Sequence, residues 1–298
     1  MAKRLKIRQP FSDKILDIFV YIVIAIVFVT SVYPFFLAIV LSFNEGLDGM
    51  LGGIYLWPRK PTLENYEKFF TDPEWFDAIL VTVARTGLGT VLTVLFTSMV
   101  SYGLAHRNLA GRKFYMGVII FAMYFSGGII PYYALLRSIK LLDSFLVYII
   151  PMLMNLFFTL VAISFFQSLP EELEEAARID GAKELGIFFR VIVPVSTPLL
   201  ATLAIFMAVQ HWNSWYDTAF FVRNQSLATL AYRMMAVIRK ADVRMVSAAA
   251  AGAYSTVKTT SMSVQLAAMS IAVAPIIFVY PFFQKYIISG ITLGSVKA

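Results

Sequence analysis

The chain has 298 residues, of which 59% are hydrophobic and 14% charged, and its mean hydropathy is +0.74. This composition excludes an ordinary soluble domain and indicates a membrane protein. The formal net charge is +7, but the basic residues are scattered in loops and form no stripe with interleaved aromatic side chains, which argues against nucleic acid as a partner. Because cysteine is absent, disulfides, thiolate nucleophiles and cysteine-ligated metals are excluded.

The first apolar segment covers residues 18–41 and contains no charged residue. At about 1.5 Å per residue, a helix of this length crosses a hydrocarbon core of roughly 30 Å. A cleavable signal peptide would have a shorter apolar region followed by a small-residue cleavage site. Neither is present, so we expect this segment to remain as a membrane span.

Five further apolar segments have the length that a spanning helix needs. They cover residues 78–105, 114–136, 144–167, 194–216 and 263–288. The expected fold class is therefore all-α, a polytopic membrane protein with six transmembrane helices. The six spans form one domain over 16–288, between a basic N-terminus at 1–15 and a C-terminal tail at 289–298.

Basic residues near the span ends predict the orientation. Five precede the first span and three lie in the short link between the second and third: Lys3, Arg4, Lys6, Arg8, Lys14, Arg107, Arg112 and Lys113. Short, densely basic segments stay in the cytoplasm, so both termini are expected there and the acidic loop 44–77 outside. The loop 218–262 is also basic and would lie outside, which a long loop tolerates.

Arg85 lies seven residues into the second predicted span. Ionisable groups inside a membrane are costly and are candidates for function. One so near a helix end can instead extend its side chain to the interface. We therefore expect Arg85 to reach the membrane surface.

An acidic cluster occupies the link between the fourth and fifth spans. Its members are Glu171, Glu172, Glu174, Glu175, Asp180 and Glu184. Ser168 and Glu171 have the spacing of a capping box, and Pro170 suits a first turn. A short helix is therefore predicted to begin there, with its acids facing the positive end of the helix dipole.

The same link predicts where this helix ends. Asp180-Gly181 suits a helix terminus, and a second short helix can run over 182–190 before Pro194 opens the fifth span. Small residues such as Ala176 and Ala177 would let another protein approach closely. From the residues alone, a docking surface and a solvated connector are equally good interpretations.

The segment EAARIDGAKELGIFFRVIVP resembles the signature of ABC-importer membrane subunits, in which Glu-Ala-Ala is followed by three residues, Gly, nine residues and Ile-x-Leu-Pro. The residues in register are Glu175, Ala176, Ala177, Gly181 and Pro194, with valine at 191 and 193. The resemblance extends through WPRKPTLENYEKFF, SGGIIPYYALL and WNSWYDTAFF to SGITLGSVKA. It is strongest to the binding-protein-dependent carbohydrate class, which includes maltose-type permeases and importers of complex oligosaccharides.

The resemblance implies that the link is a cytoplasmic coupling helix seated in a cleft of an ATPase. The coupling residues would be Glu175, Ala176, Ala177, Asp180, Gly181 and Pro194. It further implies a heterodimer with a second, different permease, two copies of the ATPase, and an extracytoplasmic sugar-binding protein at the bacterial cytoplasmic membrane, within membrane lipid. The chain has no G-x-x-x-x-G-K-[ST] sequence, so we expect no cofactor here and ATP and Mg on the ATPase partner.

Two segments are candidates for the substrate pathway. QHWNSWYD places aromatic faces beside amides, which suit a sugar, and the candidates there are Trp212, Asn213 and Tyr216. FSGGIIPYY would break a helix at membrane depth, and the candidates there are Gly128, Pro131 and Tyr132. An interfacial aromatic belt and a simple kink explain the same residues. The basic outer loop would attract an anionic sugar such as a uronate, through residues such as Arg239 and Lys240.

Other classes of membrane protein lack the residues that they need. An ion-coupled secondary transporter would carry mid-span carboxylates, whereas Asp17 and Asp217 lie at span ends. An intramembrane hydrolase would need a G-x-S-x-G-like nucleophile or paired intramembrane aspartates, and the chain has neither. His106 and His211 have no H-E-x-x-H spacing for zinc. Only the register of the coupling motif argues against a structural scaffold.

Overall fold

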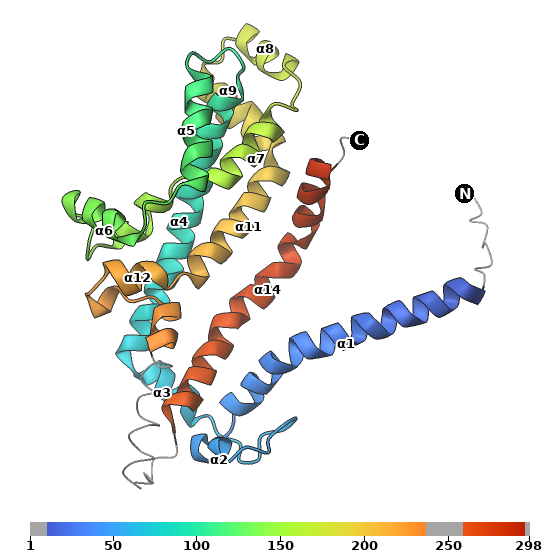
Figure 1. Cartoon of the computed structure of the whole chain (residues 1–298), viewed down its shortest axis with the longest axis vertical. Helices are drawn as coiled ribbons and strands as arrows, with labels where there is room; N and C mark the ends of the chain where they lie inside the picture. The colour runs from blue at the N-terminus through green and yellow to red at the C-terminus, as the bar shows by residue number, and fades with distance from the viewer. Residues whose placement is uncertain (1–10, 237–258, 296–298) are drawn as a thin grey trace. The chain divides into compact units, whose positions relative to one another are not determined.

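The computed structural model describes residues 11–236 and 259–295, and helices dominate them (Figure 1). The α-helices are α1 (Phe11–Ser42), α2 (Gly46–Met50), α3 (Glu64–Thr71), α4 (Pro73–Ala105), α5 (Arg112–Tyr124), α6 (Ile129–Ser138), α7 (Leu156–Phe166), α8 (Glu172–Ile179), α9 (Glu184–Ile187), α10 (Val193–Val195), α11 (Thr197–Asn213), α12 (Tyr216–Phe221) and α14 (Ser261–Ser295). The shorter elements are the 3-10 helices η1 (Phe145–Tyr148), η2 (Ile150–Met152) and η4 (Gln225–Leu227), and a π-helix η3 (Phe188–Ile192). The all-α prediction is confirmed for this part of the chain.

The chain forms two compact units. One comprises residues 1–69 and 243–271, and the other comprises residues 70–242 and 272–298. Several sequence predictions concern residues outside the described ranges. These are most of the basic N-terminus, the segment with Arg239 and Lys240, and the end of the C-terminal tail.

In the first unit, the connection after α1 returns to the end of that helix. Asn65 Nδ2 donates to the carbonyl oxygens of Ser42 at 2.9 Å and Asn44 at 2.8 Å. The backbone N–H of Glu45 donates to the Lys60 carbonyl at 2.9 Å. Because Asn65 is fully buried, these bonds fix the start of α3 against the C-terminal end of α1.

In the second unit, α4 packs against α7 and α11 (Figure 1). Thr93 Oγ1 donates to the Met152 carbonyl at 2.8 Å, and Ser101 Oγ donates to the Thr159 carbonyl at 3.2 Å. Small hydroxyl-bearing side chains of this kind let apolar helices approach closely and bond to one another. The polar residues of α4 therefore hold the helices together.

Three of the predicted spans are interrupted. The segment 114–136 divides into α5 and α6 around Gly128, whose φ of 83° places it in the left-handed region. The fourth bends by 43° between η2 and α7. The fifth bends by 84° at Ser196, so that its continuous part begins with α11 rather than at Pro194.

By length and composition, three described helices can each cross a membrane: Lys14–Ser42, Pro73–Ala105 and Ser261–Phe278. The number rises to five when each bent pair counts as one span, η1–η2 with α7 and α9–α10 with α11. The apolar helices and their lengths identify a membrane protein.

Candidate functional site

The helix α8 ends in a Schellman motif, as the Asp180-Gly181 pair predicted. The N–H of Ala182 donates to the Ala177 carbonyl, and that of Gly181 to the Arg178 carbonyl, both at 3.0 Å. Gly181 has a φ of 80°, which an L side chain rarely adopts. The helix terminus itself therefore favours the glycine of the Glu-Ala-Ala-x-x-x-Gly pattern.

The predicted start of this helix is wrong. The Ser168 hydroxyl donates to the Phe165 carbonyl at 2.7 Å, and α8 begins at Glu172, preceded by Glu171 with no side-chain cap. The reason is local competition, because the Ser168 N–H also bonds to Phe165 and continues the final turn after α7. Acids still occupy the first turn of α8, as the dipole argument requires.

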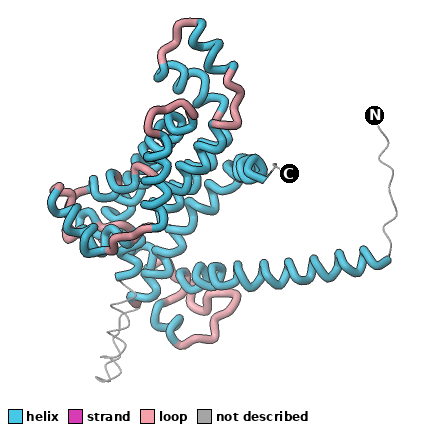
Figure 2. The backbone as a smooth tube through the Cα atoms, turned by 45° about the horizontal axis from the view of Figure 1, so that its top comes forward, coloured by secondary structure: helices cyan, strands magenta, loops and turns pink. Residues whose placement is uncertain are grey.

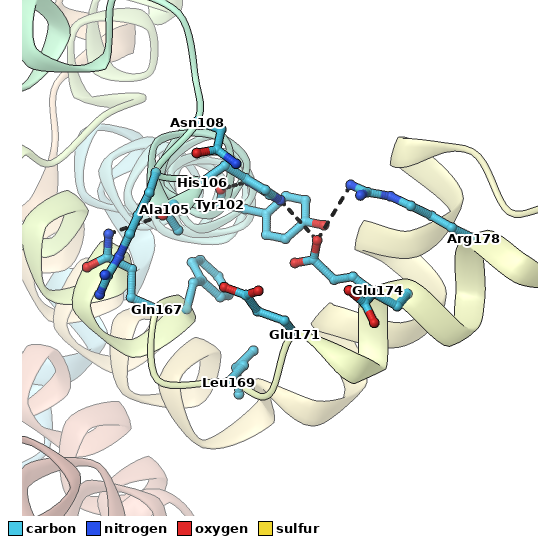
Figure 3. Close-up of a pocket in the computed structure, with 12 residues that line it drawn as sticks. Tyr102, Ala105, His106, Asn108, Gln167, Leu169, Glu171, Glu174 and Arg178 are labelled. Atoms are coloured by element: carbon cyan, nitrogen blue, oxygen red, sulfur yellow. Dashed lines mark hydrogen bonds and ion pairs between the residues drawn. The ribbon is translucent and has the colours of Figure 1, made fainter.

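A charged network ties α8 to the C-terminal end of α4. Glu174 Oε2 lies 3.0 Å from His106 Nε2 and 3.7 Å from Arg178 Nη2, and Arg178 also pairs with Glu184 at 3.0 Å. Figure 3 shows the Glu174 carboxylate between the imidazole and the guanidinium group. Gln167 Nε2 adds a hydrogen bond to the Ala105 carbonyl at 3.1 Å. These bonds join α8 and the segment before it directly to the end of α4.

His106 has two acceptors. Its Nδ1 lies 3.0 Å from the Tyr102 carbonyl oxygen, and its Nε2 faces the Glu174 carboxylate. A neutral imidazole can donate to only one of them, whereas the imidazolium ion donates to both. Burial lowers the pKa of His106, but the hydrogen bond and the negative charge of Glu174 together raise it by more, and the net shift is upward from 6.5.

A pocket of about 550 Å³ opens between the end of α4 and α8. Three carboxylates line it, those of Glu171, Glu174 and Glu175, together with the guanidinium groups of Arg107 and Arg178. Figure 3 shows Glu171, Glu174 and Arg178 beside His106 and Gln167. Acidic oxygen atoms in a partly open pocket can accept hydrogen bonds from cationic side chains.

The outward face of α8 and α9 carries apolar side chains without cover from the described part of this chain. Ile179 is 86% exposed and Leu185 is 61% exposed, next to the exposed Ala176 and Gly181. Ala177, by contrast, packs against the core around Ile187 and Phe188. Large apolar groups beside small residues are typical of a surface that another protein covers.

Arg85 does not reach the membrane surface, and the prediction that it would is wrong. Its side chain is fully buried and pairs with Asp217, and its Nη1 donates to the Ser214 carbonyl at 3.2 Å. The guanidinium lies 4.7 Å from the ring centre of Tyr148, a cation–π distance. A largely buried partner of opposite charge offsets part of the desolvation cost of this inward position. Arg85 and Asp217 carry opposite charges near the ends of two apolar segments. This sequence signal for an ion pair was not considered when Arg85 was expected to reach the membrane surface.

Similarity to known proteins shows the family of this chain. The polygalacturonan/rhamnogalacturonan transport system permease protein YtcP of Bacillus subtilis (strain 168) is 34% identical over 290 residues, covering 96% of this chain and 99% of YtcP. A crystal structure of a bacterial ABC transporter involved in the import of the acidic polysaccharide alginate superposes with a TM-score of 0.85 at 27% identity, covering 94% of this chain and 99% of that one. The chain belongs to the ABC-transporter permease family.

Another relative of this permease is the arabinooligosaccharides transport system permease protein AraQ of Halalkalibacterium halodurans. It is 29% identical, over 90% of this chain and 91% of AraQ. No protein-family model matches. The relatives are named as transport proteins, which at the level of the family supports a subunit without an enzymatic activity of its own.

The permease brings only some of the predicted pathway residues together. Tyr132 of α6 and Tyr216 of α12 both contact the ring of Phe221, at centroid distances of 5.3 Å and 6.0 Å. Trp212 instead donates from Nε1 to the Ala272 carbonyl of α14 at 3.0 Å, and Asn213 bonds to its own helix at Val209. Gly128 and Pro131 are exposed at the break before and within α6.

Proposed function

We propose that this permease is one membrane-spanning subunit of an ATP-driven importer of carbohydrate, with α8 as its coupling helix. The observation that carries the proposal is the construction of α8. Its outer face exposes Ala176, Ile179 and Gly181, while Glu174 ties its inner face to His106 at the end of α4. A helix so built can receive a movement from a docked protein and pass it to a span.

In this proposal the permease has six spans and both termini in the cytoplasm of the bacterial cell. The spans are α1, α4, α5 with α6, η1–η2 with α7, α9–α10 with α11, and α14. The dense basic residues before α1 and between α4 and α5 support this orientation. It places α8 on the cytoplasmic side, where an ATPase can dock.

Transport follows from alternating access. Two ATPase copies, which bind ATP and Mg, close and pull α8 of this subunit and the equivalent helix of a second, different permease. The outward-open cavity then takes sugar from an extracytoplasmic binding protein docked on loops 44–77 and 218–262. Net transport requires that these partners bind the two states with different affinities, because equal affinity shifts no equilibrium.

The substrate that we propose is an acidic oligosaccharide. YtcP is named for polygalacturonan and rhamnogalacturonan, and the structural relative for alginate, and these names support an anionic sugar. The basic outer loop 218–262 would attract such a ligand. Neither an ion-coupled transporter nor an intramembrane hydrolase finds support among the relatives.

The test is ATP hydrolysis by the complex purified gently from its native membrane, with sugar-loaded binding proteins added. We expect a second permease and an ATPase to copurify, and an acidic oligosaccharide to stimulate hydrolysis more than a neutral one of equal length. Replacing Arg239 and Lys240 by Gln should reduce that preference. Transport without ATP would contradict the importer, whereas equal stimulation by both sugars would contradict only the acidic substrate.

Replacing His106 by Gln should remove a pH dependence of coupling. The raised pKa means that the His106–Glu174 pair is fully charged below about 6.5 and is lost as the pH rises through the raised value. The sugar imported per ATP hydrolysed should therefore fall over that interval in the native permease. Arg178, Glu184 and Tyr102 also face this site.

His106→Gln and Glu174→Gln should each import less sugar per ATP hydrolysed at every pH, because each removes the same ion pair. The matched control is Lys113→Gln, which removes an exposed positive charge outside the pocket and should keep the native profile. Sugar uptake and ATP hydrolysis are measured in proteoliposomes between pH 5.5 and 8.5. A native ratio that does not change with pH would contradict the role of the ion pair.

A further inference from the structure

The connection between α2 and α3 contains an apolar stretch, MLGGIYLW, at residues 50–57. It has no charged residue, yet most of its large side chains point away from the protein. Leu51 and Trp57 are each 80% exposed, and Leu56 is 67% exposed, with Met50 and Tyr55 also exposed. Only Ile54 is buried. So many exposed apolar groups in eight residues exceed what a water-facing loop normally carries.

The two ends of this stretch are fixed beside the C-terminal end of α1. Arg59 Nε donates to Asp48 Oδ2 at 3.0 Å, and the Arg59 Nη2 donates to the Asp48 carbonyl at 3.1 Å. The N–H of Lys60 donates to Asn44 Oδ1 at 2.8 Å. The charged groups therefore gather at the base of the loop, and the apolar groups are confined to its tip.

The tip folds back along α1. The Tyr33 hydroxyl donates to the Tyr55 carbonyl at 3.3 Å, and Tyr33 lies nine residues before Ser42, where α1 ends. At about 1.5 Å per residue this is roughly 13 Å along the helix. Figures 1 and 2 both show the connection after α2 lying alongside α1. The apolar tip is therefore beside the spanning helix and not beyond its end.

The length of α1 relates this position to the bilayer. Its apolar part, Lys14–Ser42, has 29 residues and so measures about 43 Å. This matches a bilayer of roughly 40–45 Å including its headgroups, so Ser42 lies near the outer edge of the headgroups and Tyr33 lies below them. Interfacial segments bury their apolar faces about 5–10 Å into this boundary.

We propose that residues 50–57 form an interfacial anchor, whose Leu51, Tyr55, Leu56 and Trp57 side chains insert into the lipid leaflet around the C-terminal end of α1. Trp and Tyr favour the headgroup boundary because their rings are apolar and carry one polar atom. The Tyr33 hydroxyl satisfies the Tyr55 carbonyl, which would otherwise be costly to bury.

This anchor divides the loop 44–77 between two environments. The base, with Asp48, Arg59 and Lys60, stays in water and remains open to a binding protein, whereas the tip contacts lipid. The inference depends on α1 being a span and on no other part of the proposed function.

The absence of cysteine makes a direct test possible. Single cysteines are introduced as Leu51→Cys and Trp57→Cys and are spin-labelled in the complete transporter, which is reconstituted in phosphatidylethanolamine–phosphatidylglycerol vesicles. Collision rates are measured with oxygen, which concentrates in lipid, and with a water-soluble nickel chelate. The matched control is Leu63→Cys, since Leu63 is also exposed, at 67%, but lies beyond the base.

We expect oxygen to dominate at positions 51 and 57, and the nickel chelate to dominate at 63, a severalfold reversal of the ratio. Nickel access at 51 and 57 equal to that at 63 would overturn the proposal by placing the tip in water. Low access to both reagents would also overturn it, because protein would then cover the tip. In that case the measurement is repeated without the binding protein. Access that increases would identify the binding protein as the protein covering the tip, and unchanged access would identify the second permease.

Discussion

Replacing Gly181 by Asp is expected to abolish sugar uptake while leaving membrane insertion intact. Within this chain the new side chain has room, because no atom lies within 4 Å of a Cβ at this position. The φ of 80° adds a backbone cost of about 1 kcal/mol, since Asp is among the residues that tolerate this region best. The large effect must then come from outside the chain, where the carboxylate would block close docking of the ATPase on α8.

Gly111→Asp is the matched control, because Gly111 has a φ of 75° and a Cβ there makes only ordinary contact with Tyr115. It carries the same backbone strain away from α8. Uptake into vesicles, the amount of permease in the membrane and the amount of ATPase that copurifies are measured for both variants. Normal uptake by Gly181→Asp would mean that α8 is not the docking element. This conclusion does not depend on which sugar is the substrate.

Replacing Arg85 by Met should destabilise the permease by about 3–5 kcal/mol, the usual cost of removing one partner from a buried ion pair. Asp217 is only 17% exposed and would be left without its main partner. The loss should appear as a lower midpoint of thermal unfolding in detergent and a smaller folded fraction in membranes. Arg137→Met, at an exposed position on α6, should leave both unchanged.

The double variant Arg85→Met with Asp217→Asn distinguishes an ion pair from a general packing role. Because it leaves no unpaired charge, it should recover most of the loss of the single variant. A double variant no more stable than Arg85→Met would show that the guanidinium acts through Tyr148 and Ser214 instead.

The features that the sequence could predict are those decided within a few residues. The end of α8 follows from Asp180-Gly181 because the Schellman bonds join residues five positions apart or fewer. Its start could not be predicted, because Ser168 satisfies the carbonyl of the preceding helix as readily as it would cap the next. The local sequence does not determine whether the Ser168 hydroxyl bonds to the Phe165 carbonyl or caps α8.

Long-range contacts account for the other differences. Arg85 and Asp217 are 132 residues apart, and His106 and Glu174 are 68 apart, so their pairing depends on how α4 packs against later helices. The apolar length of the helices Lys14–Ser42, Pro73–Ala105 and Ser261–Phe278 could be predicted, because it is a property of composition. The bend at Ser196 could not be predicted, because a proline at the first turn of a helix is compatible with both a straight and a bent connection.

That bend makes residues 184–213 an elbow with two arms at 84°. The shorter arm, Glu184–Val195, measures about 18 Å, and the longer arm, Thr197–Asn213, about 25 Å. When a right-angled crank turns about its corner, a push on the short arm becomes a sideways swing of the long one, magnified here roughly 1.4-fold by the ratio of these lengths. With α11 across the bilayer, the short arm lies nearly in the membrane plane. A small stroke along the membrane normal would then tilt α11 sideways, without any helix having to slide along its axis.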